Sequence, residues 1–242
     1  MSKIKFQIAA AILTVFITLG LGTAAQADTI NSLTITGYTI TNAVDVTVNG
    51  NHLGNEYGAE FRAHLDLGNN NFQDVIGYCV DLFQSIGIGT YSGYNLSPVS
   101  SSDSTQAAAW LMGHYAPGLG NPYSPNSLTT TITALQVAIW EVTYDYSSTG
   151  SYNLGSGNFY ASNLDSAIGN LANSYLTALG SANVNLTGLN FSGVARSESN
   201  QDLIVGNTPE PGSMILFGSA AGLMGWLRRR RGQAKQDATQ TA

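Results

Sequence analysis

Cys79 is the only cysteine among the 242 residues of the chain. A single cysteine cannot form an internal disulfide, so no cross-link of that kind can hold the fold together. The fold must rest on a buried apolar core, and the stretch from Asp28 to Asn207 is long enough to build one. Apolar residues make up 43% of the chain, which is typical of a folded protein rather than a disordered one.

The first 27 residues have the pattern of a secretory signal peptide. A basic start and an apolar run over residues 8–21 precede two small residues that suit cleavage before Asp28. The basic residues are Lys3 and Lys5, and the small ones are Ala25 and Ala27. A retained membrane anchor fits less well, because the apolar run is short for a span. We therefore expect signal peptidase to remove residues 1–27 and the mature protein to be exported.

The other end of the chain also has the pattern of an addressing signal. A Pro-Glu-Pro segment is followed by an apolar run at residues 214–227 and then by four arginines. An apolar helix that ends in arginines stops in the membrane with the arginines inside, so we expect a C-terminal anchor. The run is shorter than the ~20 residues of a comfortable span, which favours a temporary anchor. The signal residues are Pro209, Glu210, Pro211, Arg228, Arg229, Arg230 and Arg231.

This C-terminal segment, residues 208–231, resembles the PEP-CTERM sorting signal of Gram-negative bacteria. The resemblance implies transient anchoring in the inner membrane through residues 214–227 and processing by an exosortase. It also implies release of the protein to the cell surface or extracellular matrix. Residues 232–242 are then a short tail.

The charge of the chain is unevenly distributed. Between Asp28 and Asn207 there are two arginines, no lysine and 13 acidic residues, which leaves a net charge of −11. Such a surface repels nucleic acid and anionic lipid, so we exclude electrostatic binding to either.

The first part of the exported region favours strands. Residues 60–67 alternate cleanly, which places Phe61 and every second residue after it on one face. Asn49-Gly50 is a hairpin turn signal. Residues 74–83 predict another strand, in which Cys79 lies opposite the most continuous apolar stripe.

The second part favours helices. We expect one helix through residues 107–112, a second capped by Asn126 or Ser127, and a third over residues 161–179. Apolar positions within residues 184–191 suggest closing strands. The predicted fold class is α+β: an antiparallel β-sheet with a central insertion of two to three helices, between an N-terminal signal helix and a C-terminal anchor helix. The domain is expected to span residues 28–196, with a polar linker at 197–207.

Two short segments resemble the signatures of bacterial thioester domains, which are best known from Gram-positive surface adhesins. The segments are Tyr78-Cys79-Val80-Asp81 and Gln136-Val137-Ala138-Ile139-Trp140. The resemblance implies that the sulfur of Cys79 replaces the side-chain nitrogen of Gln136, with loss of ammonia, and that the product acylates an amine of a partner. Gln106 lies in a similar segment and is the minor candidate for the acyl donor. A thioester must be shielded from water, and the candidate shields are Tyr78, Trp140 and Tyr144.

A second possible function is non-covalent binding of a surface or matrix ligand whose identity the sequence does not give. Loops such as Tyr91-Ser92-Gly93-Tyr94 suit adaptable contacts of this kind. In this case Cys79 is a small buried residue and Gln136 is a hydrogen-bonded amide of the core.

A third possible function is that of a cysteine hydrolase in which Cys79 acts with His114 or His64. It is disfavoured because a strand cysteine beside Asp81 lacks the electropositive setting of a catalytic thiol. The three histidines also show no metal-ligand spacing with Cys79, so neither a metal nor another cofactor is predicted. We therefore expect that the protein is not an enzyme.

Overall fold

The computed structural model describes residues 28–99, 104–123, 125–182, 184, 186–189, 191 and 193–208. The expected signal helix lies outside these residues, and so do the expected anchor helix and the tail at 232–242. In the described part of the chain, no helix is long and apolar enough to cross a membrane.

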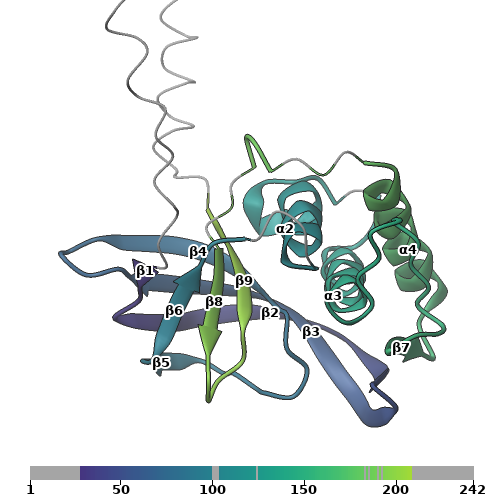
Figure 1. The fold of residues 1–242 in the computed structure, drawn as a ribbon, viewed down its shortest axis with the longest axis horizontal. Helices are drawn as coiled ribbons and strands as arrows, with labels where there is room; N and C mark the ends of the chain where they lie inside the picture. The colour runs from purple at the N-terminus through teal and green to yellow at the C-terminus, as the bar shows by residue number, and fades with distance from the viewer. Residues whose placement is uncertain are drawn as a thin grey trace, which may run out of the picture.

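A single antiparallel sheet of nine strands curls along one side of the molecule (Figure 1). The strand order is β1-β6-β8-β9-β4-β3-β2-β5, and β7 pairs with the far end of β2. The strands are β1 (Asp28–Thr29), β2 (Ser32–Val48), β3 (Asn51–Asp66), β4 (Phe72–Cys79), β5 (Gly89–Tyr91), β6 (Tyr94–Ser97), β7 (Phe159–Ser162), β8 (Gly193–Ser197) and β9 (Leu203–Asn207). The predicted antiparallel sheet is confirmed.

The long hairpin of β2 and β3 determines where the sheet meets the helices. Its turn is the predicted Asn49-Gly50 pair, and both residues have positive φ angles, 51° and 78°, as a tight hairpin turn requires. Between Ile40 and Ala43 the register shifts, which marks a bulge or irregularity in the ladder. Such an irregularity bends a strand, and the outer half of the hairpin crosses the helical side of the molecule (Figure 1).

The helices form a second layer beside the sheet, inserted in the chain between β6 and β8. They are α2 (Ser104–Tyr115), α3 (Leu128–Tyr144) and α4 (Ser166–Ser181), with a short 3₁₀ turn, η1 (Pro117–Leu119). Ser127, one of the two predicted caps, accepts a hydrogen bond from the Thr130 N–H at 3.1 Å at the start of α3. Helix α3 lies between α2 and α4 and also contacts β2, β3 and β4, so its middle is buried on all sides.

The third helix is shorter than predicted, because residues 159–162 pair with β2 as strand β7. Helix α4 begins after Asp165, whose side chain accepts a hydrogen bond from the Ala167 N–H at 2.8 Å. Pairing with a distant strand overrides the helical pattern at residues 161–162. A pairing of this kind leaves no local signal.

The C-terminal boundary of the domain is also corrected. The described residues between 184 and 191 are not in strands, and the closing strands are β8 and β9 instead. Strand β9 lies between β8 and β4, and Leu203, Ile204 and Val205 are completely buried. The prediction of a polar linker is therefore wrong for residues 203–207, which belong to the middle of the sheet. A strand of five residues flanked by polar ones is too short to be recognised from its pattern.

Candidate functional site

Cys79 is the last residue of β4, at a point where the sheet is incomplete. On one side β4 stays paired with β9 as far as Cys79, which lies opposite Leu203. On the other side the pairing with β3 ends at Gly77, opposite Phe61. The main-chain N–H and C=O of Cys79 therefore need a partner other than a strand, because buried main-chain groups are rarely left unpaired.

Gln136 supplies that partner from the middle of α3. Its Oε1 accepts a hydrogen bond from the Cys79 N–H at 3.1 Å, and its Nε2 donates one to the Cys79 C=O at 2.8 Å. Both residues are buried, with Gln136 fully inaccessible. The structure therefore brings the two predicted thioester residues together. It does not bring Gln106 to Cys79, since the Gln106 Nε2 donates to the Val184 C=O at 3.4 Å.

Gly58 of β3 allows the hairpin to lie directly on Gln136. A Cβ atom at this position would meet the Cβ and Cγ atoms of Gln136 and the Oγ1 of Thr41, each at 3.0 Å. The Thr41 hydroxyl also donates a hydrogen bond to the Gly58 C=O, which fixes the hairpin beside the bend. Sequence reasoning missed Gly58, because the contact depends on how the hairpin crosses α3.

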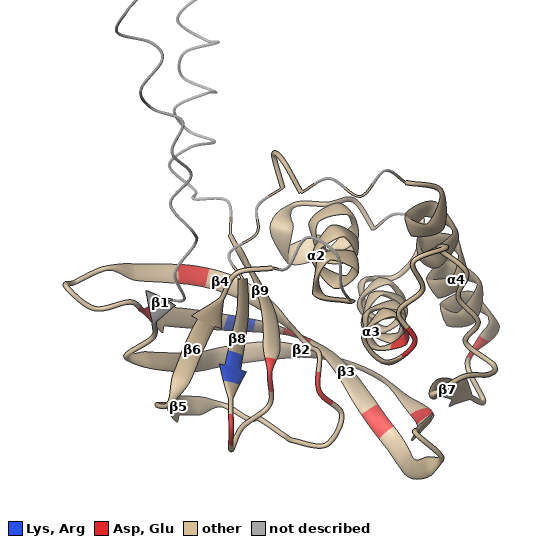
Figure 2. Cartoon of the chain, in the orientation of Figure 1, with Lys and Arg blue, Asp and Glu red and all other residues tan. Residues whose placement is uncertain are grey.

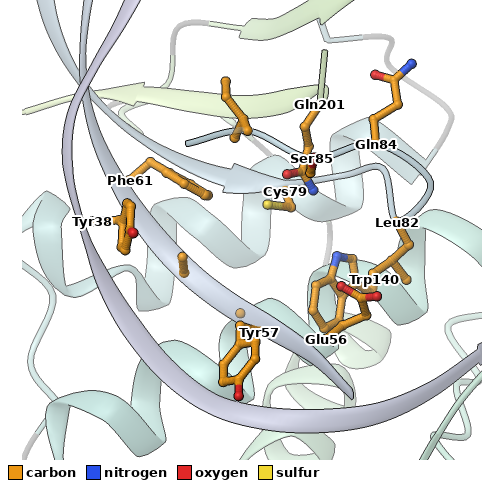
Figure 3. A pocket seen from close by; sticks show the side chains of 13 residues that line it. Tyr38, Glu56, Tyr57, Phe61, Cys79, Leu82, Gln84, Ser85, Trp140 and Gln201 are labelled. Carbon is orange, nitrogen blue, oxygen red and sulfur yellow. The ribbon is translucent and has the colours of Figure 1, made fainter. Parts of the chain in front are cut away.

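A pocket of about 470 Å³ opens over Cys79 (Figure 3). It lies between the β2–β3 hairpin, the end of β4, the segment that follows β4, and α3. Its described lining residues are Tyr38, Glu56, Tyr57, Gly58, Ala59, Phe61, Cys79, Leu82, Gln84, Ser85, Ile86, Trp140 and Gln201. Apart from Phe61, Cys79 and Trp140, sequence reasoning singled out none of them, since the register of distant strands assembles the pocket.

Of the three candidate shields, only Trp140 lines this pocket. The Tyr78 hydroxyl donates instead to Glu60 Oε2 at 2.8 Å, and the ring is completely buried. The Tyr144 hydroxyl accepts a hydrogen bond from the Leu82 N–H at 2.9 Å. Tyr144 therefore holds the segment that lines the pocket with residue 82 and residues 84–86, but Tyr144 itself does not line the pocket.

Trp140 carries a polar group that nothing in the described structure satisfies. Its side chain is 1% exposed, and its Nε1–H has no hydrogen-bond partner among the described residues. Trp140 follows Gln136 by four residues on α3, so the two side chains lie on the same face of the helix, one turn apart. Buried donors without a partner are uncommon, and one beside a pocket indicates a place for an acceptor atom.

The electrostatics of the site keep the thiol protonated. Burial raises the pKa of the Cys79 thiol far above its usual value, and the nearby charges of Asp81 and Glu56 act in the same direction. This environment disfavours the thiolate that a cysteine hydrolase uses as its nucleophile.

The positions of the histidines also disfavour a hydrolase, because none of the three lines the pocket beside Cys79. His64 contacts Asp74, and His114 stacks on Trp110 and is hydrogen-bonded to the Trp110 C=O. Neither supports Cys79 as the hydrolase hypothesis requires. In the part of the chain that the structure describes, no group of three or more His, Cys, Asp or Glu side chains is placed to hold a metal.

The tyrosine-rich segment at residues 91–94 is not an open binding loop. Tyr94 is 1% exposed, and its hydroxyl donates to the Gln201 C=O at 2.8 Å. The Tyr91 hydroxyl is hydrogen-bonded to both main-chain groups of Gly87, at 3.1 Å each. These hydroxyls hold the segment before β5 and the turn before β9.

Comparison with known families identifies the C-terminal segment. Residues 207–231 match the PEP-CTERM protein-sorting motif. The chain is thus an exported, exosortase-targeted protein that is sorted to the cell surface through a membrane anchor. No curated protein and no solved structure matches the chain.

The PEP-CTERM motif begins inside the folded domain. Asn207, its first matched residue, ends β9 opposite Val75. The next residue, Thr208, donates two hydrogen bonds to the Asp74 C=O, from its N–H and from its hydroxyl, each at 3.1 Å. The motif is therefore joined to a central strand without an intervening linker.

Proposed function

We propose that the exported domain is a surface attachment module in which Cys79 and Gln136 form an internal thioester that reacts with amines of a partner. The observation that carries the proposal is the double hydrogen bond between the Gln136 amide and the main chain of Cys79. It holds the carboxamide beside the residue that bears the only thiol of the chain, in a buried place.

Thioester formation needs no redox partner. The Cys79 Sγ attacks the Gln136 Cδ, the Cδ–Nε2 bond breaks, and the thiol proton leaves with the nitrogen as ammonia. The Cys79 N–H already donates to Oε1, so it stabilises the negative charge that develops on that oxygen during the attack. The indole N–H of Trp140 is the candidate second donor, since it is buried and unpartnered among the described residues.

In the attachment step, nitrogen displaces sulfur at the same acyl carbon. A primary amine of the partner attacks the same Cδ, the Cδ–Sγ bond breaks, and the sulfur takes up the proton that the nitrogen loses. The product is a stable amide between Gln136 and the partner. The domain has no lysine, so it offers no side-chain amine that could consume its own thioester.

The test is the intact mass of the purified mature protein, before and after treatment with methylamine. We expect a mass one ammonia below that of the sequence, and then a methylamine adduct that peptide mapping assigns to Gln136. Cys79→Ala, which cannot form the bond, is the control and should show neither change. An unmodified wild-type mass, with Cys79 alkylated by iodoacetamide once unfolded, would overturn the proposal.

Non-covalent attachment remains the second candidate, and one observation favours it. The pocket over Cys79 is bordered by exposed aromatic side chains, with Tyr57 61% and Tyr38 37% accessible. Exposed rings beside a cavity are suited to ligand contact whether or not a thioester forms. Titration of the Cys79→Ala variant with partner-derived peptides or saccharides separates this candidate from the covalent one.

A further inference from the structure

Four aromatic side chains are among the residues that line the pocket over Cys79 (Figure 3). Trp140 and Phe61 are buried at its base, whereas Tyr38 and Tyr57 lie at its exposed rim. Tyr38 packs edge-on against Phe61 with ring centroids 5.8 Å apart. Aromatic rings offer a negative face to a ligand, so a cage of them favours a cationic group with an apolar stem.

Glu56 is the one charged side chain among the described residues that line this pocket. It makes no hydrogen bond or salt bridge with any described residue, although it is half-buried. Burial raises the pKa of Glu56 above its usual value. A carboxylate that has lost part of its water and gained no partner is stabilised by a cation that binds beside it.

The lining of the pocket adds to this preference, because its described residues contribute no competing cation. No lysine, arginine or histidine is found among the described lining residues. Of the two arginines in the domain, Arg196 pairs with Asp202 at 3.1 Å. Acidic residues outnumber basic ones over the sheet and the helices (Figure 2), so the field of the whole domain attracts cations.

We propose that this pocket is a binding site for an alkylammonium cation, with Glu56 as its counter-ion and the four aromatic side chains as its walls. The inference rests on the proposed function, because the bound ammonium is the protonated form of the amine that attacks the thioester. Before attack, the ammonium transfers one proton to the Glu56 carboxylate, and the neutral amine then attacks the acyl carbon of the thioester at Cys79, the residue of the thioester pair that lines the pocket. Reversible binding itself needs no thioester.

The experiment uses the full mature protein with Cys79→Ala, in which covalent capture is impossible. Binding of n-butylammonium is measured by NMR titration and compared with binding of butan-1-ol, a neutral molecule of similar shape. We expect the ammonium to bind at least about tenfold more tightly than the alcohol. The preference should weaken as salt is raised, because the carboxylate is partly exposed.

Two variants locate the site. Glu56→Gln should remove most of the ammonium preference and leave the weak binding of the alcohol unchanged. Asp74→Asn, which removes one negative charge from an exposed side chain of the same sheet, should keep the preference. A thermal melt of each variant checks that the fold is intact.

The outcomes separate the two proposals. Equal binding of ammonium and alcohol, or an unchanged preference in Glu56→Gln, would overturn the ammonium site whatever the mass measurement gives. A wild-type protein without the ammonia loss, combined with selective ammonium binding by Cys79→Ala, would overturn the thioester and leave the ammonium site standing.

Discussion

The side-chain amide of Gln136 occupies the place that β3 vacates next to Cys79. Strand β3 pairs with β4 only as far as Gly77, and the amide then satisfies both main-chain polar groups of Cys79. A helix side chain thus continues the ladder of a sheet for one residue. The same arrangement stabilises the core and presents the carboxamide to the cysteine, so its two consequences can be tested separately.

Replacement of Gln136 by leucine should destabilise the fold even when no thioester can form. In a Cys79→Ala background, Gln136→Leu leaves the N–H and C=O of residue 79 buried without a partner. We expect the free energy of unfolding to fall by about 2–4 kcal/mol, measured by urea denaturation. The matched change Gln106→Leu loses one long hydrogen bond and should cost less than about 1 kcal/mol. Equal losses in the two variants would contradict the structural role of Gln136.

Gly58→Ala should displace Gln136. The new methyl group would meet two carbon atoms of Gln136 at 3.0 Å, so the side chain or the hairpin has to move. We expect a loss of about 1–3 kcal/mol in urea denaturation, together with a lower yield of the methylamine adduct. Gly169→Ala is the control, because a methyl group there makes ordinary contacts with Leu164 from 3.7 Å, in the interior of helix α4. That change should raise stability by about 0.5–1 kcal/mol.

The stability of the domain should fall as the pH rises through the range in which the Glu141 carboxyl group loses its proton. Its side chain is 1% exposed and its Oε2 has no hydrogen-bond partner among the described residues. Burial raises the pKa of Glu141 to about 7 from the usual 4.5, although the Asn153 N–H lowers it and Asp145 adds a smaller increase. Between these two pH values the folded state binds more protons than the unfolded state, so stability decreases with increasing pH.

The expected loss is on the order of 2 kcal/mol between about pH 4.5 and pH 7. Urea denaturation at several pH values measures it. Glu141→Gln keeps an oxygen for the Asn153 N–H and cannot ionise, so its stability should vary less over this range. The prediction would be contradicted if the stability of the wild type and that of the variant changed with pH in the same way.

Truncation should show that β9 is part of the fold. A chain that ends after Ser199 lacks Leu203, Ile204 and Val205, all of them fully buried. Burial of each such side chain contributes about 1.5–3 kcal/mol, and their sum is comparable with the whole stability of a typical domain. We expect this chain to lose its cooperative thermal transition by circular dichroism, whereas a chain that ends after Thr208 keeps it. Two identical melting curves would contradict the position of β9.

Export and sorting could be predicted from the sequence because their signals are linear. The Pro-Glu-Pro segment, the apolar run and the arginines follow one another along the chain, and each acts by composition rather than by tertiary contact. The antiparallel sheet, the Asn49-Gly50 turn and the cap at Ser127 were also accessible, since they depend on neighbouring residues. The predictions were wrong at β7 and at β9, because these strands pair with strands that are remote in sequence, β2 and β4.

The sequence by itself determined that Cys79 has no disulfide partner within the chain, that the domain is acidic and without lysine, and that residues 208–231 carry a sorting signal. Only the tertiary structure decided that Gln136 rather than Gln106 reaches Cys79, and that Glu56 faces the pocket over it. The physical reason is that composition and signals are properties of the chain itself. The site instead depends on where β3 separates from β4 and on how closely Gly58 lets the hairpin approach α3.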